Sequence, residues 1–263
     1  MFQKVQYGVT DGVATIEMVY PKNLNAIDEQ MAEELLEALA LAEKDEAVRV
    51  IVLKGGEKAF SAGGDIGYFY DLVKSGEAIN MDGLIERVGK LALACKQSSK
   101  LIIAAVQGAA AGAGASLAFS ADFIFCTEQA KFILAFVQLG LAPDTGVTYL
   151  LAKQIGDKRA MELAVTGRPL GAAEAKELGL VYAVTSKEEL DEAVSAFASK
   201  LVTGPAVAYA NIKKQVVAAS FLEYEVFLKE VESKTQSICS NTEDFKEGVV
   251  AFMEKRKPDF QGK

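Results

Sequence analysis

Strand-like and helix-like patterns of hydrophobic residues alternate along the first part of the chain. Residues 3–8 and 12–19 are alternating or β-branched runs separated by "TDG", which predicts a β-hairpin. Residues 29–44 carry apolar side chains at helical spacing, and Asp28 is suited to cap that helix. The next run, "VRVIVLKG", is apolar without alternation, which is typical of a strand buried on both faces.

The middle of the chain contains a long uncharged stretch, residues 101–121. Its length is sufficient for a membrane span. However, "LIIAAV" is strand-like, Gly108 interrupts the run, and Gln107 and Asp122 lie within or beside it. A buried strand, a turn of small residues and a buried helix therefore explain the stretch better, and "ADFIFCTEQAKFIL" returns to strand character.

Helical patterns dominate the remainder of the chain. Residues 146–155, 157–165 and 171–178 predict three short helices, "GLVYAV" predicts a last strand, and the pattern is helical from about residue 186 onward. Alternating strands and helices followed by helices alone predict an α/β core with a C-terminal helical module. We place the core at residues 1–198 and the module at residues 199–263.

Composition restricts the class of protein. The chain has 263 residues, of which 51% are hydrophobic, and a formal net charge of -8. These values are typical of a soluble globular protein and argue against general binding of nucleic acid or anionic membranes. Three widely separated cysteines without a CxxC pattern, and an N-terminus without a signal-peptide pattern, favour reduced thiols and a cytoplasmic location.

The chain contains no histidine. Ser-His-Asp and Cys-His catalysis and zinc sites with histidine ligands are therefore excluded, and three scattered cysteines make a thiolate metal site improbable. Any chemistry must come from carboxylates, lysine, tyrosine, backbone dipoles or a bound cofactor.

Two glycine-rich turns are the first candidates for such chemistry. In residues 60–66, "FSAGGDI", and 108–117, "GAAAGAGASL", a strand is followed by small residues and then by a helix. Such turns expose backbone N–H groups at a helix N-terminus, and two facing turns would form a two-donor oxyanion hole. Close packing of helix against strand is the simpler interpretation of either turn alone.

Asp144 is the second candidate. It follows a proline in the otherwise uncharged stretch "LGLAPDTGV". On the residues alone, an N-cap of the following helix is the simpler interpretation. A catalytic base is the alternative, since an apolar pocket lined by residues such as Phe136 and Leu141 would raise the pKa of Asp144 toward neutrality.

Several motifs, in order along the chain, resemble the enoyl-CoA hydratase/isomerase (crotonase) superfamily. They are "NLNAI", "AFSAGGDI", "VQGAAAGAGASLAFSADF", "GLAPDTG", "RAMELAVTGRPLGAAEAKELGLV" and "EDFKEGVVAFMEKRKPDF". The resemblance covers essentially the whole chain. It implies a spiral of ββα units with a C-terminal helical trimerisation module, and a thioester enolate stabilised by the backbone N–H groups of Gly64 and Ala113.

The resemblance also implies how the substrate is bound. Ala62 would meet the adenine of coenzyme A, with Asp65 and Ile66 nearby. Phe252 and Lys255, in "AFMEKRKPDF", would meet the nucleotide from a neighbouring subunit, although a solvated helix end explains the lysines as well. The substrate would be a thioester of coenzyme A or acyl-carrier protein, with no metal and no redox cofactor, and the protein a homotrimer or a dimer of trimers.

Two departures from the family pattern bear on the reaction. Hydratases of the family carry two glutamates that activate water, and this chain has Ser116 and Phe136 at those positions. Ser116 could hydrogen-bond the substrate or simply pack within its helix. Asp144 resembles the catalytic aspartate of family isomerases. We therefore expect a 3-enoyl to trans-2-enoyl thioester isomerase; a hydratase-like enzyme, a ring-opening isomerase and a silent acyl-CoA-binding protein are the alternatives.

Overall fold

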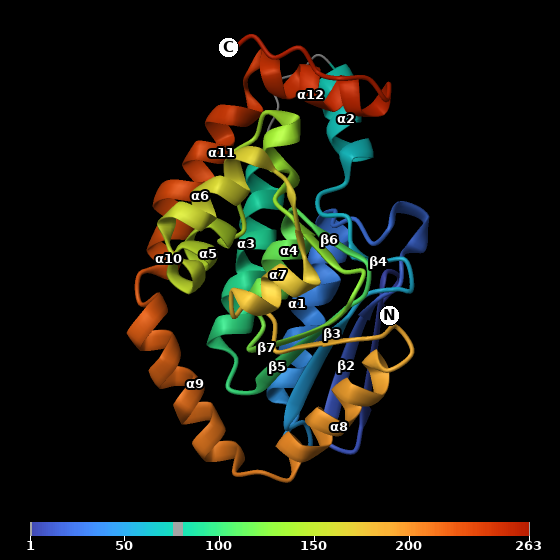
Figure 1. The fold of residues 1–263 in the computed structure, drawn as a ribbon, viewed down its shortest axis with the longest axis vertical. Helices are drawn as coiled ribbons and strands as arrows, with labels where there is room; N and C mark the ends of the chain where they lie inside the picture. The colour runs from blue at the N-terminus through green and yellow to red at the C-terminus, as the bar shows by residue number, and fades with distance from the viewer. Residues whose placement is uncertain (1, 76–80, 263) are drawn as a thin grey trace.

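The computed structural model describes residues 2–75 and 81–262 and contains two β-sheets surrounded by helices (Figure 1). The larger sheet has the strand order β1-β2-β3-β5-β7-β10. Its strands are β1 (Val5–Thr10), β2 (Val13–Met18), β3 (Val50–Lys54), β5 (Leu101–Val106), β7 (Phe123–Thr127) and β10 (Ala183–Thr185). β1 and β2 form the predicted antiparallel hairpin, and the other neighbouring pairs are parallel.

The smaller sheet has the order β4-β6-β8-β9. Its strands are β4 (Ala59–Ser61), β6 (Ala109–Ala111), β8 (Lys131–Ile133) and β9 (Pro169–Gly171). Each of β3, β5 and β7 is followed by one strand of this smaller sheet and then by helix, which is the expected spiral of ββα units. The helices up to this point are η1 (Pro21–Asn23), α1 (Glu29–Lys44), α2 (Ile66–Ser75), α3 (Asp82–Gln97), α4 (Ala113–Ser120), η2 (Ala135–Leu139), α5 (Val147–Ile155) and α6 (Asp157–Thr166); α7 (Ala172–Glu177) follows β9.

The central strands are buried on both faces. Ile51 and Leu53 of β3 belong to the main core with α1, α3 and α4, whereas Val50 and Val52 face a second core under α8 (Leu190–Val202). Since successive side chains of a strand point to opposite faces, burial of both faces requires a continuous apolar run. This explains the absence of alternation in the sequence of β3.

The C-terminal segment consists of α8, α9 (Ala206–Phe221), α10 (Tyr224–Phe227), the π-helical turn η3 (Leu228–Glu232), α11 (Ser233–Ser240) and α12 (Glu243–Met253). In Figure 1, α9 extends along one edge of the molecule away from the sheets, and the chain then returns through α10 and α11 toward α3. α12 lies beside α2. The proposed division at residue 198 falls within α8 and stays a prediction.

The sequence interpretation missed two strands, β6 and β9, and misplaced a third. β9 was expected to be part of a connection, because three residues that include a proline and a glycine carry little strand signal. Only Ala183–Thr185 forms the last strand, since Gly179, with a φ of 77°, belongs to the turn after α7. Residues 101–121 form β5, β6 and α4, so the strand and the helix were expected but β6 replaces part of the expected turn. No helix of the described residues is long and apolar enough to cross a membrane.

Candidate active site

The two glycine-rich turns lie against each other. β4 and β6 are parallel neighbours, so the chain segments that follow them emerge side by side. A Cβ atom on Gly63, whose φ is 88°, would lie 2.6 Å from the Ala111 carbonyl oxygen, and one on Gly114 would lie 2.6 Å from the Ser61 Cβ. The glycines therefore do permit close packing. The same packing brings Gly64 and Ala113 to one cavity.

This cavity has a volume of about 70 Å³ and a mostly apolar lining. Gly64, Ala113 and Asp144 all contribute to it, and so do three further predicted residues, Ala62, Ile66 and Phe136. Its other lining residues are Ile27, Phe69, Leu84, Val88, Gly112, Ala135, Leu139, Leu141, Thr145 and Gln236. Ala113 is the first residue of α4, so its N–H group has no acceptor within the helix.

Asp144 does not cap the following helix. α5 begins at Val147, its N-cap is Gly146, and no side chain caps it. The Asp144 carboxyl is instead buried, at 9% exposure, and its Oδ2 accepts a hydrogen bond of 3.1 Å from Gln236 Nε2. Oδ1 has no partner among the described residues. Burial raises the pKa of Asp144 to about 7, against the opposing effect of the Gln236 hydrogen bond.

These properties suit a general base. Asp144 is the one ionisable side chain among the described residues that line the cavity. A carboxylate whose pKa lies near the working pH can both take and return a proton. In the described part of the chain, no group of three or more His, Cys, Asp or Glu side chains is placed to hold a metal ion.

Four predicted residues lie outside the lining of this cavity. Ser116 is fully buried and donates its hydroxyl to the Gly112 carbonyl at 3.3 Å, which favours its interpretation as a packed helix residue. Asp65 accepts hydrogen bonds from Gly67 N and Tyr68 N at the start of α2. Phe252 is 54% exposed in α12, and Lys255 is exposed just beyond it. Their contact with a neighbouring subunit's ligand stays a prediction.

Glu232 was not found by sequence reasoning, although it lies beside Asp144. It is 3% exposed, and its Oε2 accepts a hydrogen bond of 2.5 Å from Gly146 N. Burial, followed by the charge of Asp144, raises the pKa of Glu232 to about 8. Glu232 and Gln236 stand in an amphipathic helical stretch, "VESKTQSICS", whose pattern does not distinguish a buried polar residue from a solvated one.

The buried polar atoms without a partner are concentrated at this site. Within the described residues, four buried side-chain atoms have no hydrogen-bond partner: Asp144 Oδ1, Thr145 Oγ1, Glu232 Oε1 and Gln236 Oε1. Buried polar groups are normally paired, since an unpaired one costs about 1–3 kcal/mol. Their concentration around one carboxylate makes this region the strongest candidate for a functional site.

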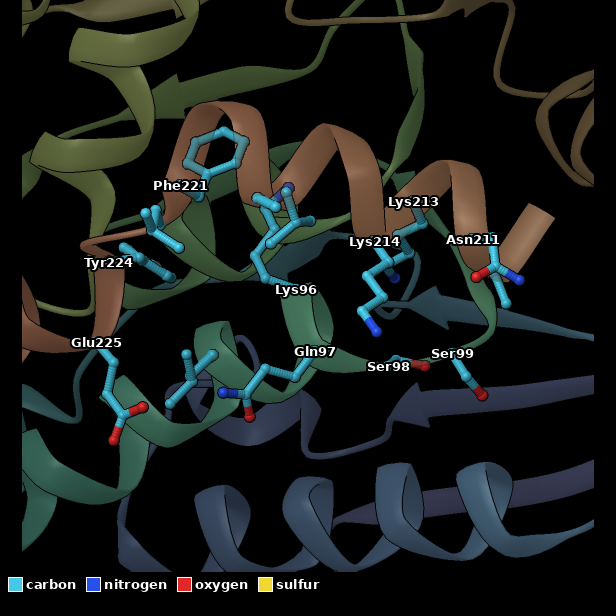
Figure 2. A pocket seen from close by; sticks show the side chains of 15 residues that line it. Lys96, Gln97, Ser98, Ser99, Asn211, Lys213, Lys214, Phe221, Tyr224 and Glu225 are labelled. Carbon is cyan, nitrogen blue, oxygen red and sulfur yellow. The ribbon is translucent and has the colours of Figure 1, made fainter. Parts of the chain in front are cut away.

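A larger cavity, of about 470 Å³, lies between α3 and α9 (Figure 2). The side chains of Lys96 and Lys214 project into this space from the two helices. Lys213, also in its wall, is already paired with Asp122 at 2.7 Å. The only carboxylate among its described lining residues, Glu225, is exposed and paired with Lys229. This cavity therefore lacks the buried carboxyl and the facing turns of the candidate site.

The fold and the site together define a class of protein. The chain forms a two-sheet ββα spiral, and its two backbone turns share an apolar cavity with a buried carboxyl. This arrangement is that of the crotonase superfamily, whose enzymes act on acyl thioesters. The family model "Enoyl-CoA hydratase/isomerase" matches residues 8–263. The chain belongs to this family.

The relatives of this chain are named for different activities. It is 37% identical to the trans-2-decenoyl-[acyl-carrier-protein] isomerase of Streptococcus mutans, covering 100% of this chain and 99% of the relative. It is 35% identical to the 1,2-epoxyphenylacetyl-CoA isomerase of Escherichia coli, covering 100% of both. The crystal structure of an enoyl-CoA hydratase from Mycobacterium avium subsp. paratuberculosis matches with a TM-score of 0.90 and 32% identity, covering 99% of this chain and 100% of that one.

Proposed function

We propose that the protein is an isomerase that converts a 3-enoyl thioester into the trans-2-enoyl thioester, with Asp144 as its single base. One observation carries the proposal: the buried Asp144 carboxyl shares an apolar cavity with Gly64 and Ala113, and no second ionisable side chain of the described residues lines it. The proposed reaction needs one base and one pair of oxyanion donors.

The proposed steps conserve atoms and charge. The thioester carbonyl lies between the N–H groups of Gly64 and Ala113, and Asp144 removes a proton from C2. The electron pair of that C–H bond forms the C1–C2 double bond of a dienolate, whose charge rests on the oxygen held by the two N–H groups. Asp144 then returns the proton at C4, the double bond settles between C2 and C3, and the carboxylate is regenerated.

The same cavity argues against hydration by the usual route of the family. That route uses two glutamates to activate a water molecule. Phe136 lines the cavity at the position of one, and Ser116, at the position of the other, is buried with its hydroxyl bonded to a backbone carbonyl. A proton transfer that consumes no water fits an apolar lining.

Ultraviolet absorbance with two substrates tests the proposal. A medium-chain 3-enoyl-CoA and the matching trans-2-enoyl-CoA are incubated separately with purified protein, and the acyl-carrier-protein thioesters are assayed in parallel. Increasing absorbance from the 3-enoyl substrate reports the conjugated product that we expect. Decreasing absorbance from the 2-enoyl substrate would report hydration, and no change with any thioester would leave a binding protein without this activity.

We also propose that the C-terminal helices assemble a homotrimer or a dimer of trimers. α9 exposes Val207, Ile212 and Val216, and Leu222, directly after the helix, is exposed as well, an unusual concentration of apolar side chains. Light scattering coupled to size-exclusion chromatography measures the mass of the assembly, and a monomer at micromolar concentration would refute the proposal.

A further inference from the structure

Three side chains of the C-terminal segment contact three successive residues of the turn that carries Asp144. Gln236 Nε2 donates to the Asp144 carboxylate at 3.1 Å. Tyr224 Oη donates to the Thr145 carbonyl at 3.4 Å. Glu232 Oε2 accepts from the Gly146 N–H at 2.5 Å. Each residue of the turn 144–146 is therefore held by its own partner from a distant part of the chain.

The turn needs external support because its backbone is strained. Thr145 has a φ of 59°, a left-handed conformation that a β-branched residue rarely adopts. Gly146 also has a positive φ, of 80°, and a Cβ atom there would lie 1.9 Å from Tyr224 Oη. Strained turns persist at functional sites when the surrounding structure overdetermines them.

Glu232 and Gln236 are spaced to act together. They are four residues apart in a helical segment, so their side chains lie on the same face, one turn above the other. The π-helical turn η3 ends at Glu232, and α11 begins at the next residue. π-Helical turns within α-helices are often found at functional sites.

We propose that Gln236 and Glu232, assisted by Tyr224, are positioning residues that hold the strained turn 144–146 and thereby aim the Asp144 carboxyl at the substrate. This inference rests on the proposed role of Asp144 as the base. Gln236 acts on the carboxylate directly, and Glu232 acts through the Gly146 N–H. Neither needs to touch the acyl thioester for this role.

The charged groups around Glu232 belong to an adjoining cavity that shares Thr145 with the active-site cavity. Glu86 and Lys90 face it from α3, and Glu225 and Lys229 face it from α10 and η3. Glu86 pairs with Lys90 and Glu225 with Lys229, each at 2.7 Å. Because these charges are balanced in pairs, Asp144 is the main charge that Glu232 experiences: burial first, and then the charge of Asp144, raises the pKa of Glu232.

The test uses substitutions that preserve side-chain volume. Gln236→Met removes the hydrogen bond to Asp144. Glu232→Met removes the acceptor for Gly146 N–H, whereas Glu232→Gln retains an acceptor oxygen. Glu230→Gln is the matched control, since Glu230 is exposed on the same segment and paired with Lys234. Each variant is assayed for kcat and KM, and the Asp144 pKa is measured by ¹³C NMR of aspartate-labelled protein, with Asp144→Asn providing the assignment.

We expect Gln236→Met and Glu232→Met to lower kcat about 10- to 100-fold with little change in KM, because small displacements of a catalytic group have effects of that order. Gln236→Met should also raise the pKa of Asp144, since the Gln236 hydrogen bond lowers it. Glu232→Gln should recover most of the kcat, and Glu230→Gln should match the wild type in both measurements.

Either of two results would overturn the inference. The first is a Gln236→Met variant whose kcat and Asp144 pKa equal those of the wild type. The second is an equal loss of kcat in Glu232→Met and Glu232→Gln. If Glu232→Met does not fold, the kcat values of Glu232→Gln and Gln236→Met test the inference in its place. The NMR titration needs no substrate, so it separates the two proposals. A shifted Asp144 pKa in Gln236→Met, with no isomerisation by the wild type, would refute the proposed function but not the contact that positions Asp144.

Discussion

Gly63 packs so closely against the carbonyl oxygen of Ala111 that the space for a side chain is filled, and this packing joins the two turns of the candidate site. A Cβ atom on Gly63 would lie 2.6 Å from that oxygen, closer than Cβ atoms approach other atoms in folded proteins. Gly63 also has a φ of 88°, which disfavours any residue with a side chain. Two independent constraints therefore require glycine here.

Gly63→Ala is expected to reduce the free energy of unfolding by about 1–3 kcal/mol and to lower activity, because the strain falls on the backbone of both turns. Urea denaturation and the isomerase assay measure the two effects. Gly171→Ala is the matched control, since a Cβ atom there would have no neighbour within 4 Å. Equal stability of the two variants would contradict the constraint at Gly63.

Asp144→Asn is expected to lower kcat by about 10²–10⁴-fold, the usual contribution of a positioned general base. The amide has nearly the same size and can still accept the hydrogen bond from Gln236. Binding of a 2-enoyl-CoA product, measured by isothermal titration calorimetry, should therefore remain near that of the wild type. Turnover within about threefold of the wild type would remove Asp144 from the mechanism.

The pH dependence of kcat/KM should show an acid limb near pH 7. Burial raises the pKa of Asp144 to about 7, and only the ionised carboxylate can take a proton from C2. Activity should therefore decrease as the pH falls below 7 and level off above it. A limb at pH 4, where ordinary aspartates titrate, would show that Asp144 is not buried in the active state.

The same pKa predicts how stability depends on pH. The folded protein holds the Asp144 proton up to about pH 7, whereas the unfolded chain releases it near pH 4. Between these values the unfolded state binds fewer protons, so the ionisation of Asp144 lowers stability as the pH rises. Asp144→Asn lacks this effect, and its stability relative to the wild type should increase from pH 4.5 to pH 8 in urea denaturation. A constant difference would contradict the raised pKa.

Lys213→Met should destabilise the fold without altering the chemistry. The Lys213 side chain is 3% exposed, and its Nζ donates to Asp122 at 2.7 Å and to the Lys100 carbonyl at 2.9 Å. Removing one member of a buried ion pair leaves the other unpaired, at a cost of about 3–5 kcal/mol. Lys214→Met, at the neighbouring exposed position, is the control. Thermal melts compare the two variants, and equal melting temperatures would show that the pair contributes nothing.

Much of the fold could be predicted from local patterns. The hairpin, the Asp28 cap, the buried run of β3 and the helices α1 and α4 to α7 depend on spacing and on residue types that act within a few positions. β9 could not be predicted in this way, because its three residues become a strand only by pairing with β8 at the edge of the smaller sheet.

The candidate site, like the fold, could be predicted from the sequence only in part. The glycine-rich turns and the isolated Asp144 are visible in the sequence, since glycines beside a strand and a lone carboxylate in an apolar stretch are unusual. Glu232 and Gln236 are not visible, because their helix has the ordinary alternation of polar and apolar residues. Their contacts with residues 146 and 144 span 86 and 92 positions of the chain, and no local pattern records such contacts.

By itself, the sequence determined most of the elements, the family resemblance, the exclusion of histidine chemistry and the short list of residues able to move a proton. Only the tertiary structure showed that Asp144 is not the helix cap, which leaves the proposed base. A cap and a base require the same residue after the same proline, and they differ in where the helix begins and in what surrounds the carboxyl. Here the helix begins at Val147, and the carboxyl is buried against Gln236, because packing across distant segments, rather than local preference, sets its environment.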